Sequence, residues 1–101
     1  MVRRQTSVGS PDRQRLDKWL WHARFARTRT LAARLVSDGH VRLNGARTEA
    51  PSHAVKRGDV LTLALVRTAL VLRVKDFGER RGGAEDARRL YEIVPPPGET
   101  G

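Results

Sequence analysis

The 101-residue sequence contains no cysteine and only three histidines. The absence of cysteine excludes disulfide bridges and thiolate metal sites, and it fits a reducing cytoplasm. His22, His40 and His53 show no spacing typical of paired metal ligands, so we expect neither a metal nor a cofactor. Long apolar runs are also missing. The longest runs, such as residues 63–66, are far too short to span a bilayer. These absences predict a cytoplasmic protein without a membrane segment or a metal centre.

The length of the chain limits it to one domain with a modest core, without room for a separate catalytic module. Residues 1–12 are polar, and residues 95–101 are rich in proline and glycine. Such compositions are typical of segments without regular structure. The sequence therefore predicts a disordered leader over residues 1–12, a folded unit over 13–94 and a disordered tail over 95–101.

Two short helices are predicted in the first part of the folded unit. Apolar side chains recur at helical spacing over residues 15–26, which indicates the first helix. Thr28 is a suitable N-cap for a second helix that ends at Gly39, where glycine permits a left-handed C-cap. Phe25 is expected to be buried against the hairpin that follows, whereas His22 is expected at the surface or beside a bound phosphate. The predicted buried face of the second helix consists of Leu31, Ala32, Leu35 and Val36.

A β-hairpin is predicted next, because the apolar period switches to two and Asn44-Gly45 is a strong signal for a two-residue turn. This turn places Arg42 directly opposite Arg47, an arrangement that destabilises an isolated hairpin. A bound phosphate would remove the repulsion. Alternatively, the two side chains splay apart with help from Glu49. The sequence leaves both alternatives open.

The remaining elements complete an α+β fold. A turn with Gly58 at positive φ leads into a strand over residues 60–65, and a turn near residues 67–68 returns the chain as a strand over 69–75. Residues 84–93 have acidic residues in the first turn and apolar residues on one face, so they predict a final helix that docks on the sheet.

Charge is concentrated in residues 13–34, where seven basic residues accompany one acid, Asp17. This stretch carries +6 of the net +9 of the chain, and a localised basic patch attracts phosphate backbones through counterion release. Alternatively, an arginine-rich genomic composition accounts for the number of basic residues in this stretch. Asp17 is interpreted as an orienting partner of Arg15 or Arg24, or as a charge complementing the helix dipole, because no second catalytic group has a defined spacing to it.

Four sequence blocks together resemble the S4 RNA-binding domain. They are RLDK at residues 15–18, RFARTR at 24–29, VSDGHVRLNG at 36–45 and VKRGD at 55–59. Within that family, the opening RLDKWLW and the segment around residues 84–92 resemble the heat-shock protein 15 group, which includes small S4 proteins of bacterial ribosome-associated quality control. The resemblance implies an S4-type (αL) fold, with two short N-terminal helices packed on a small, mainly antiparallel sheet and a short C-terminal helix.

The resemblance also implies that the starts of both helices face RNA, with the hairpin and the turn near Gly58 as a second wall. A helix N-terminus exposes N–H groups and a partial positive charge, which suits a phosphate. The residues predicted to contact RNA are Arg15, Lys18, Arg24, Arg27, Thr28, Arg29, Arg34, Arg42, Asn44, Arg47, Lys56 and Arg57.

We therefore expect a non-catalytic, monomeric protein that binds structured RNA. Its ligands would be rRNA and tRNA on the large ribosomal subunit, in rescue or quality control of stalled subunits that carry peptidyl-tRNA. A general RNA binder in ribosome assembly would carry the same residues and remains an alternative. Two short helices at an angle can also imitate a helix-turn-helix, so a duplex-DNA-binding protein is a second alternative.

Overall fold

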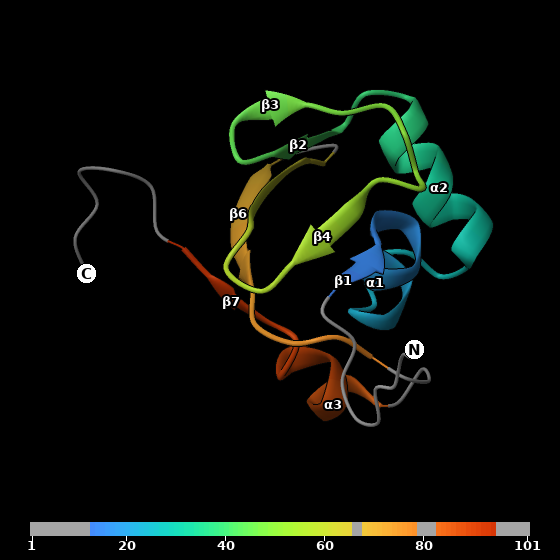
Figure 1. Cartoon of the computed structure of the whole chain (residues 1–101). Coiled ribbons are helices and arrows are strands. Elements are labelled where there is room, and N and C mark those ends of the chain that lie inside the picture. Colours follow the sequence, from blue (N-terminus) through green and yellow to red (C-terminus); the bar gives the residue numbers. More distant parts are fainter. Residues whose placement is uncertain (1–12, 66–67, 79–82, 95–101) are drawn as a thin grey trace, which may run out of the picture.

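The structure, a computed structural model, describes residues 13–65, 68–78 and 83–94. Its main sheet has five antiparallel strands in the order β3-β2-β5-β6-β7, and a second, two-stranded sheet pairs β1 with β4. Helices α1 (Leu16–His22) and α2 (Arg29–Ser37) lie on one side of the main sheet (Figure 1). The α+β prediction is thus confirmed. The predicted leader, the predicted tail and part of the turn near residues 67–68 lie outside the described residues.

Helix α1 ends four residues earlier than predicted. The Arg24 N–H donates to the Trp21 carbonyl and the Phe25 N–H donates to the Leu20 carbonyl, which together form a Schellman motif. This motif requires a left-handed residue, and Arg24 occupies the position with φ 66° although glycine is the usual choice. The early stop turns Phe25 back toward the core, where its ring centroid lies 4.9 Å from that of Tyr91.

Helix α2 begins at the predicted cap. The Thr28 Oγ1 accepts a hydrogen bond of 3.0 Å from the Leu31 N–H, and the helix ends in a second Schellman motif with Gly39 at φ 86°. Ala32 and Val36 are fully buried as predicted. Leu31, however, is 45% exposed, so the predicted buried face is wrong there. Helix α1, which is only seven residues long, packs against α2.

The hairpin of β2 (Val41–Leu43) and β3 (Ala46–Arg47) has the predicted register, with Arg42 opposite Arg47. Asn44 and Gly45 have φ values of 52° and 86°, as a type I′ turn requires. An ion pair of 3.1 Å joins Arg47 to Glu49. This contact supports the alternative in which the guanidinium groups diverge with help from Glu49.

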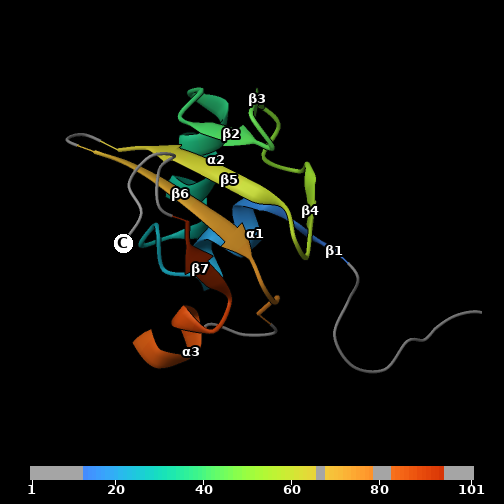
Figure 2. The ribbon, with the colours of Figure 1, turned by 90° about the vertical axis from the view of Figure 1, so that its left-hand side faces the viewer.

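The first strand was not predicted from the sequence. Strand β1 (Arg13–Arg15) pairs with β4 (Ala54–Lys56), and Figure 2 shows this ribbon at the side of the main sheet. The Leu16 N–H then donates to the His53 carbonyl and the Asp17 N–H to the Pro51 carbonyl. Carbonyl groups of the loop before β4 therefore accept hydrogen bonds from the first N–H groups of α1.

Strands β5 (Val60–Ala64) and β6 (Ala69–Val74) confirm the two predicted central strands. The predicted final helix is wrong in its second half, because α3 spans only Ala84–Arg88 and residues Tyr91–Ile93 form strand β7. Strand β7 hydrogen-bonds to the free edge of β6, and an ion pair between Arg73 and Glu92 links the two strands. Pairing at a sheet edge thus overrode local helical periodicity.

The core lies between the two helices and the sheet. Trp19, Leu20 and Val36 are fully buried with sheet residues such as Leu61. The Trp19 Nε1 donates a hydrogen bond of 2.8 Å to the Asp76 carbonyl.

His22, expected at the surface, is only 2% exposed and lies against Gly78. A Cβ at Gly78 would lie 2.7 Å from the His22 Cγ, so only glycine fits there without movement. None of the helices within the described ranges is long and apolar enough to cross a membrane.

Replacing Thr28 with alanine should destabilise the fold by about 1 kcal/mol, because the Leu31 N–H loses its acceptor. Urea unfolding followed by circular dichroism measures this loss. The matched control is Thr30→Ala, which removes an exposed threonine from the first turn of the same helix without touching the cap. Equal effects of the two substitutions would contradict a capping role for Thr28.

Candidate nucleic-acid interface

Most of the net charge belongs to residues 13–59. This stretch holds eleven basic residues and four acids, which gives +7 of the total +9. It forms α1, α2, the hairpin and the small β1–β4 ribbon, which adjoin one another in the upper part of Figure 1. The fold therefore gathers the basic residues of one continuous segment on neighbouring elements.

Asp17 joins the starts of the two helices. Its side chain is 5% exposed and accepts hydrogen bonds of 3.1 and 3.0 Å from Nε and Nη2 of Arg15. The Arg29 Nη2 lies 3.8 Å from the Asp17 Oδ1, and the Lys18 N–H donates to the same oxygen at 2.7 Å. The prediction that Asp17 orients Arg15 agrees with these contacts. We call Asp17, Arg15 and Arg29 together the clamp. In the clamp, one carboxylate forms ion pairs with two guanidinium groups.

The clamp leaves its two cations accessible. The side chains of Arg15 and Arg29 are 51% and 45% exposed, so each retains a face toward solvent. The hydrogen bonds and the charge of Asp17 raise the pKa of Arg15 above its already high ordinary value. The two guanidinium groups of the clamp therefore carry two positive charges against the single negative charge of Asp17.

The starts of the two helices differ as anion sites. The first N–H groups of α1 donate to the loop before β4, as described above, so they are not available to a ligand. In α2, helix geometry leaves the N–H groups of Arg29 and Thr30 without an intrahelical acceptor. All four residues from Arg27 to Thr30 are exposed, so none of the described helices and strands covers this end. The entrance to α2, defined as Arg27–Thr30, is the open site.

Two residues predicted to contact RNA have structural contacts of their own. The Asn44 Oδ1 accepts from the Val60 N–H at 2.9 Å, and its Nδ2 donates to Asp59 at 3.2 Å, which ties the hairpin turn to β5. The Arg57 guanidinium pairs with Asp76 at 2.9 Å and lies 4.8 Å from the centroid of the Phe77 ring. RNA contact by Asn44 and Arg57 stays a prediction.

The other predicted residues divide into two groups by position. Lys18 lies within α1 and is half-buried, and Arg24 follows that helix and is exposed. Arg42, Arg47 and Lys56 are exposed on the hairpin and on β4. Arg47 also lies over the end of α2, because a Cβ at Gly39 would lie 2.2 Å from its Nη2. A cation at this place suits the negative end of the helix dipole.

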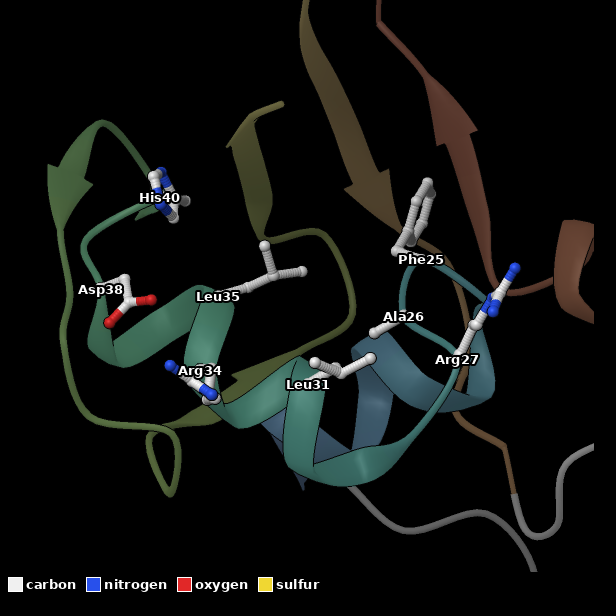
Figure 3. Close-up of a pocket in the computed structure, with 8 residues that line it drawn as sticks. All are labelled: Phe25, Ala26, Arg27, Leu31, Arg34, Leu35, Asp38 and His40. Carbon is white, nitrogen blue, oxygen red and sulfur yellow. The ribbon is translucent and has the colours of Figure 1, made fainter. Parts of the chain in front are cut away.

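A groove beside α2 was not predicted from the sequence. It has a volume of about 460 Å³, and Figure 3 shows its lining from the loop after α1, from α2 and from the turn that leads into β2. The lining residues are Phe25, Ala26, Arg27, Leu31, Arg34, Leu35, Asp38 and His40. Only its two arginines had been predicted, because helical periodicity placed Leu31 and Leu35 in the core.

A second hollow of about 350 Å³ lies between the hairpin and β4. Arg13, His53 and Lys56 line it together with Asp59. Of these basic residues only Lys56 had been predicted, since Arg13 was not expected to lie in a strand. Within the described parts of the chain, no cluster of histidine and acidic residues could hold a metal ion.

Replacing Asp17 with alanine should lower the free energy of unfolding by roughly 1–3 kcal/mol, because the Lys18 N–H and the clamp lose a buried acceptor. Urea unfolding measures the loss. Asp38→Ala is the matched control, since it removes an exposed carboxylate at the end of α2 and should change stability by less than about 0.5 kcal/mol. Similar losses for the two variants would show that Asp17 does not hold the helices together.

Comparison with known proteins agrees with this geometry. The S4 domain family matches residues 14–61, which include the clamp, both helices and the hairpin. Heat shock protein 15 of Escherichia coli K12 is 44% identical over 78 residues, which span 77% of this chain and 58% of that protein. The small ribosomal subunit protein uS4 of Xanthobacter autotrophicus is 42% identical over 69 residues, or 66% of this chain and 34% of that protein.

A solved structure gives the same result for the fold. Heat shock protein 15 of Vibrio cholerae, described as trimeric, superposes with a TM-score of 0.76 at 39% identity. The match covers 81% of this chain and 82% of that one. Since sequence and fold agree over most of both chains, this protein belongs to the heat shock protein 15 family of S4-domain proteins.

Proposed function

We propose that this protein is a non-catalytic, cytoplasmic RNA-binding protein that holds structured RNA at the entrance to α2. The observation that carries the proposal is the exposed first turn of α2 with the clamp arginines beside it. A phosphate there meets the free N–H groups of Arg29 and Thr30, the helix dipole and charged guanidinium groups together. Family membership and the match to a ribosomal protein support RNA as the ligand.

The more specific target is the large ribosomal subunit that still carries peptidyl-tRNA after a stalled round of translation, with rRNA and tRNA as the ligands. The family resemblance implies this target. The matched segment spans little more than half of the E. coli relative, so functions of the rest of that protein do not transfer to this chain. We expect a monomer in solution, whereas the V. cholerae structure is described as trimeric.

Replacing Arg27 and Arg29 together with alanine should weaken RNA binding by on the order of 1–3 kcal/mol for each phosphate contact at low salt. Fluorescence anisotropy with a labelled RNA hairpin measures the change. The matched control is Arg88→Ala with Arg89→Ala, which removes the same charge from the exposed surface around α3, away from α2 in Figure 1. Unchanged affinity after the first pair of substitutions would rule out the entrance to α2 as the RNA site.

The salt dependence of the same binding reports the number of phosphate contacts. With about five phosphates neutralised, the log–log slope should be roughly −3 to −5. A flat response would indicate a protein partner instead. Competition by double-stranded DNA at matched salt tests the alternative class of ligand, because a duplex-DNA-binding protein would release its RNA.

Large ribosomal subunits that carry peptidyl-tRNA should retain the protein better than empty subunits do. Co-sedimentation with the two preparations, at equal subunit concentration and salt, measures the difference. Equal retention would argue against a role in rescue and would favour the alternative of a general structured-RNA binder in ribosome assembly. The arginine pair of α3 provides the control variant here too.

A further inference from the structure

The groove beside α2 combines an apolar floor with a charged rim. Leu31 and Leu35 are one turn apart on the same flank of α2, and Phe25 lies beside them on the loop after α1 (Figure 3). Arg27 and Arg34 lie at the rim, toward opposite ends of the lining. Its volume of about 460 Å³ lies within the range of roughly 300–1,000 Å³ that small-molecule sites occupy.

The apolar surface of this groove is narrow. Among the described residues, the large apolar side chains that remain exposed are Leu31 and Ile93, at 45% and 54%. Leu31 extends a surface begun by the half-buried Leu35 and Phe25, whereas Ile93 lies on the edge strand β7. A docking site for a protein usually presents a larger apolar patch with several anchors. The groove instead suits one flat apolar group.

The charges around the groove favour an anionic ligand. Arg27 and Arg34 contribute two positive charges against the one carboxylate of Asp38, and His40 adds a ring that can donate a hydrogen bond. Arg27 also belongs to the entrance to α2. A strand of RNA whose phosphates lie at that entrance therefore passes directly beside the groove.

We propose that the groove holds one unstacked nucleotide of the bound RNA. Its base lies against Leu31 and Leu35, its phosphate lies by Arg34, and the neighbouring phosphate at the entrance to α2 lies by Arg27. Asp38 accepts hydrogen bonds from an amino group of the base, since a carboxylate is an acceptor only. Single-stranded loops and bulges supply such splayed bases, whereas a regular duplex does not. This proposal rests on the proposed RNA binding at α2 and adds a preference for unpaired nucleotides.

The test compares two RNA hairpins that differ at one position. The first carries a single bulged adenosine, and the second carries an abasic ribose in its place, so both have the same phosphates. The wild-type protein should bind the first roughly tenfold more tightly, as expected for one buried base. Leu31→Ser should abolish this preference and leave the affinity for the abasic hairpin and the salt dependence unchanged. Ile93→Ser is the matched control, because Ile93 is exposed outside the groove.

A second variant tests the charged rim independently of Leu31. Arg34→Gln should weaken binding of both hairpins and reduce the steepness of the log–log salt slope by about one. Thermal unfolding of each variant must match that of the wild type before its affinity is interpreted, and exposed positions permit this. A preference that survives Leu31→Ser, or salt dependence unaltered by Arg34→Gln, would place the nucleotide elsewhere.

The remaining outcomes separate this proposal from the proposed function. If neither hairpin binds, RNA binding itself is wrong. If both bind equally tightly and with a steep salt dependence, the phosphate site stands and the base-binding groove is overturned. If the hairpins bind equally but Leu31→Ser lowers retention on large ribosomal subunits, the groove contacts another part of the subunit and the nucleotide proposal fails.

Discussion

One buried carboxylate determines how the basic face is arranged. Asp17 lies at the start of α1, yet it reaches the arginine that precedes that helix and the arginine that begins α2. Without such an acceptor, two guanidinium groups brought close together would repel each other. With it, their positions are fixed while about half of each side chain stays in solvent. The clamp therefore gives two basic side chains of a charge-rich segment defined positions at the surface.

The same arrangement separates two helix starts that look alike in the sequence. Strand β1 draws the start of α1 against β4, where loop carbonyls use its N–H groups. The start of α2 follows the left-handed Arg24 and the return of Phe25 to the core, and it projects into solvent. Leu31 is exposed on the same helix. An open anion site and an apolar groove therefore lie side by side on α2.

Local signals were sufficient where one residue type dominates the backbone choice. Thr28 marked the start of α2, Gly39 its end, and Asn44-Gly45 the hairpin register that sets Arg42 opposite Arg47. Local signals failed where a segment distant in the sequence supplies the hydrogen-bonding partner of a strand. Residues Tyr91–Ile93 continue the helical spacing of apolar residues in α3, but they form a strand that pairs with β6. No local pattern predicts the strand at Arg13–Arg15, which pairs with β4. Arg24 replaces the glycine that normally signals a helix end.

The sequence by itself determined the fold class, the family, both caps of α2, the hairpin turn, and the concentration of positive charge before residue 60, since these follow from residue type and spacing. Only the tertiary structure decided which basic side chains are held near the entrance to α2 and which form contacts in other parts of the fold. Arg57 is held by Asp76 and the ring of Phe77, whereas Arg29 meets Asp17 and still faces solvent. The physical reason is that exposure and pairing depend on segments that meet in space, and charge alone does not specify them.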